Sequence, residues 1–146
     1  MKVCIFCGSS MGNDVRYQEA AAHLGEVLAQ NDCTLYYGGG NIGLMKIIAD
    51  KMIEKGKEVI GIITKGLIDM ELAHDNITKL VEVETMSERK LMLINESDIF
   101  IAMPGGFGTL DELFEIVVLN QLCITDKPVA LYIAIPIGIS WFTLFV

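Results

Sequence analysis

The stretch TLYYGGGNIGLMKIIADKMIEKGKEVIGII, residues 34–63, decides the fold. Two short apolar runs, residues 34–37 and 58–63, enclose a segment in which apolar side chains recur at helical spacing. Glycines crowd the turn before this segment, and Gly56 follows it, where a glycine commonly ends a helix. The pattern predicts a strand, a crossover helix over residues 44–55 and a second strand parallel to the first.

The alternation of apolar runs and helical segments continues on both sides of this stretch. We expect further strands at residues 2–6, 80–84, 98–103 and 128–132, and further helices at residues 14–30, 86–96 and 108–122. Residues 64–79 have a mixed pattern. The sequence therefore predicts a single α/β domain over residues 1–146, a Rossmann-like doubly wound parallel sheet in three αβα layers. Ligands of such sheets bind beyond the carboxyl ends of the strands.

The charge balance indicates which partners to expect. Eleven Lys and Arg stand against nineteen Asp and Glu, which gives a net charge of −8. So acidic a chain is not suited to neutralising many phosphates of a nucleic acid. We therefore expect a small-molecule ligand and no nucleic-acid partner, and an anionic ligand must be bound by local groups.

The four cysteines favour a reducing compartment. The N-terminal apolar run is too short for a secretory signal, so we expect a cytoplasmic chain. Cys4 and Cys7 form a CxxC, but Cys33 and Cys123 are isolated and provide no second pair of zinc ligands. No His or Cys cluster accompanies the acidic motifs either. The sequence predicts ordinary core and loop cysteines and no metal site.

Three strand-to-helix junctions are rich in glycine or small residues. They are CGSS at residues 7–10, GGGNIG at residues 38–43 and PGGFGT at residues 104–109. Glycine lets backbone N–H groups approach a ligand, and the following helix directs its positive dipole end to the same place. These loops are candidate phosphate contacts, through Gly8 and Ser9, Gly39 and Gly40, and Gly105, Gly106, Gly108 and Thr109.

Two nucleotide-binding classes are disfavoured by the same loops. Gly38, Gly40 and Gly43 match G-x-G-x-x-G, but the next strand ends in Ile63 and Thr64 and not in the acid that a dinucleotide site needs. The motif also follows the second strand and not the first. An NAD-dependent oxidoreductase is therefore disfavoured, and the absence of GxxxxGK[ST] disfavours a P-loop triphosphatase.

The charged motifs SERK and PGGFGTLDE, residues 87–90 and 104–112, begin two successive helices. We expect Thr109 to cap the second helix, with Glu112 in its first turns. Acids there can simply complement the helix dipole, and Arg89 and Lys90 can be solvated surface charges. Beside an anion site, however, a carboxylate can stabilise a cationic transition state or orient water, and the basic pair can hold a phosphate.

CGSS, YGGGNIGLM, SERK and PGGFGTLDE, in this order, resemble the LONELY GUY (LOG) family of cytokinin-activating phosphoribohydrolases, whose bacterial members were often labelled possible lysine decarboxylases. The resemblance extends to about residue 132. It implies an enzyme that hydrolyses the N-glycosidic bond of a nucleoside 5′-monophosphate, AMP or an N6-modified AMP, to free base and ribose 5-phosphate. It also implies a homodimer and no cofactor. A decarboxylase would need pyridoxal phosphate on a lysine, and no lysine is singled out.

The resemblance also assigns site residues. Arg89 and Glu112 match the catalytic pair of the family, and Gly105, Gly106, Gly108 and Thr109 match its phosphate-binding loop. Lys90 and Glu71 match positions of the nucleotide site. Cleavage of a ribosyl C–N bond passes through an oxocarbenium-like state, which a fixed carboxylate such as Glu112 can stabilise while it activates water. Lys46 departs from the family pattern GLMG and puts the local helix packing in question. A non-catalytic nucleotide- or cofactor-binding protein on the same sheet remains the alternative.

The last stretch, VALYIAIPIGISWFTLFV, residues 129–146, contains no charged side chain. It can be a membrane anchor, a natural final strand with a loop, or the product of an altered reading frame. A membrane span is disfavoured because the stretch contains Pro136 and Gly138 and because the sheet needs residues 128–132 as a strand. One base added before a reverse translation of residues 133–146 gives NSNPYWDFMVYTFR, which is similar to the loop and helix expected there. We therefore expect a C-terminus truncated or altered by a frameshift.

Overall fold

The computed structural model describes residues 1–70 and 72–133, and these form the predicted alternation of strands and helices. In chain order the elements are β1 (Lys2–Phe6), α1 (Val15–Gln30), β2 (Thr34–Tyr37), α2 (Gly43–Glu54), β3 (Val59–Thr64), α3 (Lys65–Asp69), β4 (Lys79–Val83), α4 (Met86–Glu96), β5 (Ile99–Ala102), α5 (Phe107–Gln121) and β6 (Val129–Leu131). The mixed segment 64–79 contains the short helix α3. The unusual stretch 134–146 and Glu71 lie outside the described residues.

The strands form one parallel sheet in the order β4-β3-β2-β1-β5-β6. The chain builds outward from β1 to β4, then returns to the other side of β1 with β5 and β6. The predicted doubly wound α/β fold is thus confirmed. In such a sheet the connections of β1 and β5 diverge to opposite faces, which opens a crevice beyond their carboxyl ends.

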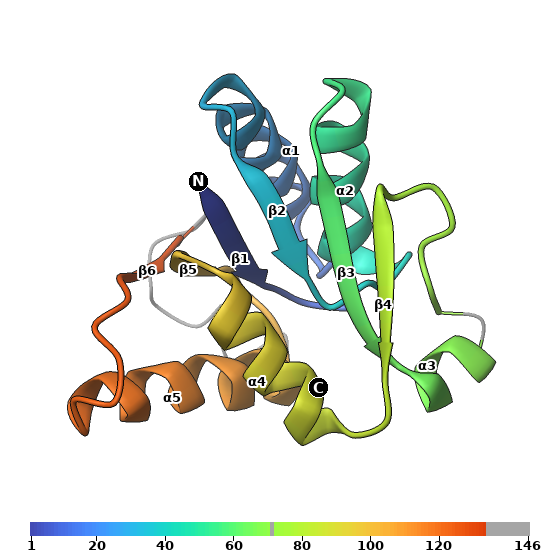
Figure 1. Cartoon of the computed structure of the whole chain (residues 1–146). Helices are drawn as coiled ribbons and strands as arrows, with labels where there is room; N and C mark the ends of the chain where they lie inside the picture. The colour runs from blue at the N-terminus through green and yellow to red at the C-terminus, as the bar shows by residue number, and fades with distance from the viewer. Residues whose placement is uncertain (71, 134–146) are drawn as a thin grey trace.

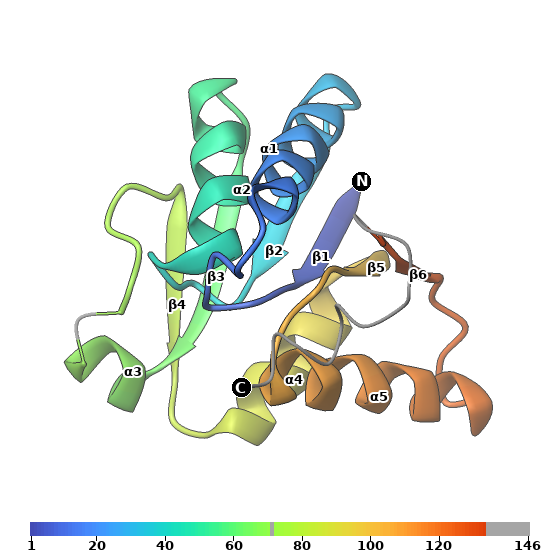
Figure 2. The same cartoon turned by 180° about the vertical axis from the view of Figure 1, so that it is seen from behind.

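The helices cover the two faces of the sheet in pairs. Figures 1 and 2 show α1 and α2 side by side on one face, and α4 and α5 on the other. Alternate residues of β1 explain this layering, because successive side chains of a strand point to opposite faces. Val3 and Ile5 belong to the core beneath α1 and α2, whereas Cys4 and Phe6 belong to the core beneath α4 and α5.

This alternation also separates the two cysteines of the CxxC motif. Cys4 packs in the core on the α4 and α5 side, and Cys7 packs on the α1 and α2 side. All four cysteines are free, and Cys4, Cys7 and Cys33 are buried. The prediction of ordinary core cysteines for these three residues agrees with their placement.

Side chains cap the first turns of two helices, and a third helix starts differently from the prediction. Asp14 caps α1 by accepting a hydrogen bond from the backbone N–H of Arg16 at 2.9 Å. Thr85 and Glu88 form a capping box at α4. The expectation that Thr109 caps α5 is wrong, because the N-cap residue of α5 is Gly106 and Thr109 lies within the first turn.

The contact between Gly105 and Thr109 accounts for this earlier start. A Cβ atom added to Gly105 would lie 2.1 Å from Thr109 Oγ1, so the loop folds directly onto the threonine side chain. Thr109 is buried as a result. Thr109 therefore lies inside α5 because the loop packs against the helix, and the capping preference of threonine takes no account of such packing.

No helix within the described part of the chain is long and apolar enough to cross a membrane.

Candidate active site

The three glycine loops meet at the carboxyl edge of the sheet, and hydrogen bonds connect them. The N–H of Leu44, at the start of α2, donates to the carbonyl of Gly8 at 3.1 Å. The N–H of Gly8 in turn donates to the carbonyl of Pro104 at 3.1 Å. Gly43 has φ +60°, and a Cβ atom there would lie 2.3 Å from the carbonyl carbon of Ser9. Loops far apart in sequence are therefore fixed as one surface.

A cleft of about 350 Å³ opens between these loops and the first turns of α4 and α5. Seven of the predicted site residues line it: Ser9, Gly40, Arg89, Gly106, Gly108, Thr109 and Glu112. The remaining lining residues are Cys7, Gly38, Ile42, Met45, Ile63, Leu67, Leu72, Met86 and Phe107.

Three predicted glycines lie in the same loops but not in the lining of the cleft. Gly8 lies close to Gly105, with 3.3 Å between a Cβ added to Gly8 and the Cα of Gly105. Gly39 has φ +74°, a conformation that favours glycine. Their direct contact with substrate stays a prediction, and in this structure they shape the loops.

Arg89 is fixed by the backbone of two neighbouring strands. Its Nε donates to the carbonyl of Ile62 at 2.8 Å, and its Nη2 donates to the carbonyl of Gly38 at 3.1 Å. Any side chain at residue 38 would collide with it, because a Cβ there would lie 1.9 Å from Nη2. Two of the three guanidinium nitrogens thus donate to backbone carbonyls, and the third, Nη1, faces Glu112 and donates to Met86 Sδ at 3.8 Å.

Glu112 reaches the cleft from the second turn of α5 and is largely buried. Its Oε1 lies 3.5 Å from Arg89 Nη1. Burial raises the pKa of Glu112 to about 7, although the nearby positive charge of Arg89 opposes the rise. Near neutral pH the carboxyl group therefore exists in both protonation states, so it is able to take up or release a proton.

Lys90 does not line the cleft. Its Nζ lies 3.0 Å from Asp111 Oδ2 and 2.5 Å from Glu115 Oε2. The hydrogen bond to Glu115 raises the pKa of Lys90 most, and the hydrogen bond to Asp111 raises it further. Two carboxylates already compensate its charge, so the role of Lys90 in nucleotide binding stays a prediction. Glu71, also assigned to the nucleotide site, lies outside the described residues.

The apolar wall of the cleft was not among the predicted site residues. This wall consists of Ile42, Met45, Ile63, Leu67, Leu72 and Met86. Ile63 could have been found from its place near the end of a strand. Leu67 and Leu72 come from the mixed segment 64–79, where no regular pattern indicates which side chains face a ligand.

Lys46 and His74 also have defined places in the structure. Lys46, which departs from the family pattern, extends along α2 and pairs with Asp50 at 2.7 Å, so it leaves the packing of the helix intact. His74 is buried and contacts Asp50. Among residues 1–70 and 72–133, no group of three or more His, Cys, Asp or Glu side chains could hold a metal ion.

Comparison with known proteins relates this site to a family. A family model described as "Possible lysine decarboxylase" matches residues 45–134. Cytokinin riboside 5′-monophosphate phosphoribohydrolase LOG1 of Arabidopsis thaliana is 45% identical over 130 residues, which cover 89% of this chain and 61% of that protein. Probable cytokinin riboside 5′-monophosphate phosphoribohydrolase LOG6 of the same plant is 45% identical over 129 residues, covering 88% and 64%. The chain spans about three fifths of the length of these curated relatives.

Solved structures share the fold at lower identity. The molybdenum cofactor binding protein from the phototrophic bacterium Rippkaea orientalis matches with a TM-score of 0.72 and 23% identity, over 90% of this chain and 76% of that chain. This likeness concerns the fold alone. The family match covers most of the sheet, the helix that carries Arg89 and the helix that carries Glu112, and the chain therefore belongs to the LOG family, whose model bears the description possible lysine decarboxylase.

Proposed function

We propose that this protein hydrolyses the N-glycosidic bond of a nucleoside 5′-monophosphate, AMP or an N6-modified AMP, and releases the free base and ribose 5-phosphate. The observation that carries the proposal is the buried pair of Arg89 and Glu112 in a cleft bordered by the glycine loops. The names of the curated relatives, which are phosphoribohydrolases, support it.

The first turn of α5 is suited to the 5′-phosphate. Gly106, Gly108 and Thr109 line the cleft there, and no side chain caps this end of the helix. Backbone N–H groups and the positive end of the helix dipole attract an anion without a cluster of basic side chains. This agrees with the acidic composition of the chain. Gly105 contributes by letting the loop fold onto Thr109.

The Arg89–Glu112 pair is suited to the reacting ribose. As the C1′–N bond breaks, its electron pair leaves with the base and positive charge develops on the ribose. The ionised Glu112 stabilises this charge and accepts a proton from the water that attacks C1′. The departing base takes one proton from solvent, and Glu112 returns its proton to solvent, so the reaction consumes one water. Arg89 holds the carboxylate in place through Nη1.

The apolar wall is suited to the base. Met45, Ile63 and Leu72 line the side of the cleft formed by α2, β3 and the connection after α3. Apolar side chains accept the face of a purine and an N6 substituent better than they accept a charged group. We propose that adenine lies here, at the opposite side from the first turn of α5.

The proposed reaction is tested by product analysis. The purified chain is incubated with AMP, GMP, CMP, UMP, N6-prenyl-AMP and L-lysine, and free bases, ribose 5-phosphate and cadaverine are quantified by chromatography. We expect equimolar base and ribose 5-phosphate from the adenine nucleotides and no cadaverine. Binding of AMP in calorimetry without release of adenine would instead support the non-catalytic nucleotide-binding alternative.

We further propose that the protein is a homodimer that works in the cytoplasm. Phe114, Val117 and Val118 are exposed on one side of α5, at a spacing that forms a continuous apolar face. Light scattering after size exclusion should give twice the monomer mass, and Phe114→Asp should shift the population to monomer. The free state of all four cysteines is consistent with a reducing compartment.

A further inference from the structure

The connection between α3 and β4 forms part of the cleft by pairing with the second glycine loop. The N–H of Asn41 donates to the carbonyl of Leu72 at 2.8 Å, and the N–H of His74 donates to the carbonyl of Gly39 at 2.9 Å. Gly40 and Ala73 form an antiparallel bridge between these bonds. Gly40 and Leu72 both line the cleft, so this short pairing builds one of its walls.

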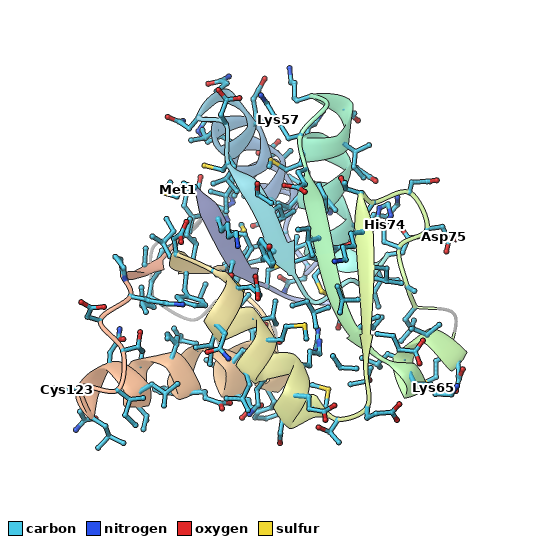
Figure 3. All side chains as sticks on the ribbon, viewed as in Figure 1. Met1, Lys57, Lys65, His74, Asp75 and Cys123 are labelled. Carbon is cyan, nitrogen blue, oxygen red and sulfur yellow. The ribbon has the colours of Figure 1, made fainter. Side chains whose placement is uncertain are left out.

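His74 attaches this wall to the body of the protein. Figure 3 labels His74 and Asp75 on the connection that leads into β4. His74 is 2% exposed, and Nε2 lies 3.0 Å from Asp50 Oδ1 on α2. The N–H of Asn76 donates to Nδ1 at 3.3 Å, so the ring proton belongs on Nε2 and is donated to Asp50. The His74 ring thus connects Asp50 on α2 with the backbone of Asn76 in the α3–β4 connection.

The acceptor of this hydrogen bond is itself held in place. The other oxygen of Asp50, Oδ2, lies 2.7 Å from Nζ of Lys46, one helical turn earlier on α2. These two contacts lower the pKa of Asp50 against the effect of its partial burial, so the carboxylate stays ionised. Among the described residues of the α3–β4 connection, His74 is the one buried polar side chain.

We infer that His74 is a positioning residue, which holds Leu72 and Gly40 in the wall of the cleft by anchoring their segment to Asp50. This inference deepens the proposed function and rests on it for its kinetic readout. Arg89 and Glu112 do not depend on His74 for their contacts. Loss of the anchor should therefore weaken nucleotide binding while the chemical step is spared.

The kinetic test compares His74→Ala with His74→Gln and with His23→Ala, the control on the exposed side of α1. For His74→Ala we expect the KM for AMP to rise about tenfold and kcat to change less than about twofold, because the wall loses one anchoring hydrogen bond and must then be ordered by the bound nucleotide. The glutamine variant, whose amide can donate to Asp50, should have a KM between those of His74→Ala and the unaltered chain. An unchanged KM, or an equal fall of kcat in all variants at position 74, would overturn the inference.

Amide hydrogen exchange separates this inference from the proposed reaction. The amides of Asn41 and His74 donate across the pairing, so in His74→Ala and Asp50→Ala they should exchange at least tenfold faster, whereas the amide of Leu35 in β2 should not change. This readout needs no turnover and decides the case if the protein proves to be inactive. If His74→Ala does not fold, Asp50→Ala and His74→Gln serve in its place. Unchanged exchange at Asn41 would contradict the anchoring role.

Discussion

Arg89 Nη1 lies 3.5 Å from Glu112 Oε1, and the two side chains are only 9% and 12% exposed. The contact joins two successive helices, α4 and α5, across the carboxyl edge of the sheet. Because the backbone carbonyls of Ile62 and Gly38 occupy the rest of the guanidinium, the position of Arg89 is set before any substrate arrives. Glu112 is thus held by a cation that has little freedom to move, which is the form of preorganisation that electrostatic catalysis requires.

The pH dependence of the reaction should report Glu112. Its pKa is raised to about 7, mainly by burial. In the proposed reaction the ionised carboxylate is the form that stabilises the ribosyl cation. As pH falls through about 7 the carboxylate takes up a proton, so kcat should decline tenfold per pH unit on the acidic side and reach a plateau above about pH 8. Steady-state rates from pH 5 to 9 check this. A profile that is flat down to pH 5 would contradict the elevated pKa.

Replacement of Arg89 should affect both the fold and the chemistry. Arg89→Ala leaves the buried carbonyls of Ile62 and Gly38 without their donors, and it leaves Glu112 without its cation. We expect a loss of about 3 kcal/mol in the free energy of unfolding and of roughly 10²–10³ in kcat. Urea titration and AMP hydrolysis measure the two effects. Arg89→Lys, which keeps the charge but not the fork of donors, should be intermediate in stability and remain poorly active.

Lys90 should tune the acidity of Glu112 from outside the cleft. Its positive charge pairs with the carboxylates of Asp111 and Glu115, which both raise the pKa of Glu112. The charge of Lys90 itself lowers the pKa of Glu112. In Lys90→Gln these acids are unopposed, so the midpoint of the pH profile should move above its wild-type value. The KM for AMP should change little. A large rise in KM with an unmoved midpoint would instead place Lys90 in direct contact with the nucleotide.

Gly43 should be the most sensitive glycine of the second loop. Its φ of +60° is unfavourable for other residues, and a Cβ would collide with the backbone of Ser9. We expect Gly43→Ala to lower the free energy of unfolding by about 2–4 kcal/mol. Gly56 supplies a matched control, since it has φ +67° with no atom within 4 Å of the added Cβ. Gly56→Ala should cost only about 1 kcal/mol, and equal losses for the two variants would rule out the loop contact.

The parallel α/β sheet and the meeting of the glycine loops could be predicted from the sequence. Parallel strands place all their carboxyl ends at one edge, so CGSS, GGGNIG and PGGFGT had to converge once the strands were recognised. The pairing of Arg89 with Glu112 came from the resemblance to a family and not from spacing. The start of α5 was missed because it depends on the packing of Gly105 against Thr109, whereas a capping preference describes only the local chain.

The wall of the cleft and the elevated pKa of Glu112 could not be predicted from the sequence. Leu72 is placed in the wall of the cleft by hydrogen bonds that pair Leu72 with Asn41 and His74 with Gly39, more than thirty residues earlier in the chain. No local sequence pattern indicates such a pairing. The pKa of Glu112 depends on how far α4 and α5 exclude water from one carboxyl group. Both features arise from tertiary packing between segments far apart in the sequence.

Glu112, held by Arg89, is the group that we propose cleaves the bond between ribose and base. The most direct measurement compares the chain with Glu112→Gln in the release of adenine from AMP at pH 8, with calorimetry to establish that both bind AMP. We predict equimolar adenine and ribose 5-phosphate from the unaltered chain and at least a roughly hundredfold lower rate from the variant, at similar affinity. Equal rates in the two proteins, or no adenine from either despite bound AMP, would show that Glu112 does not catalyse this cleavage.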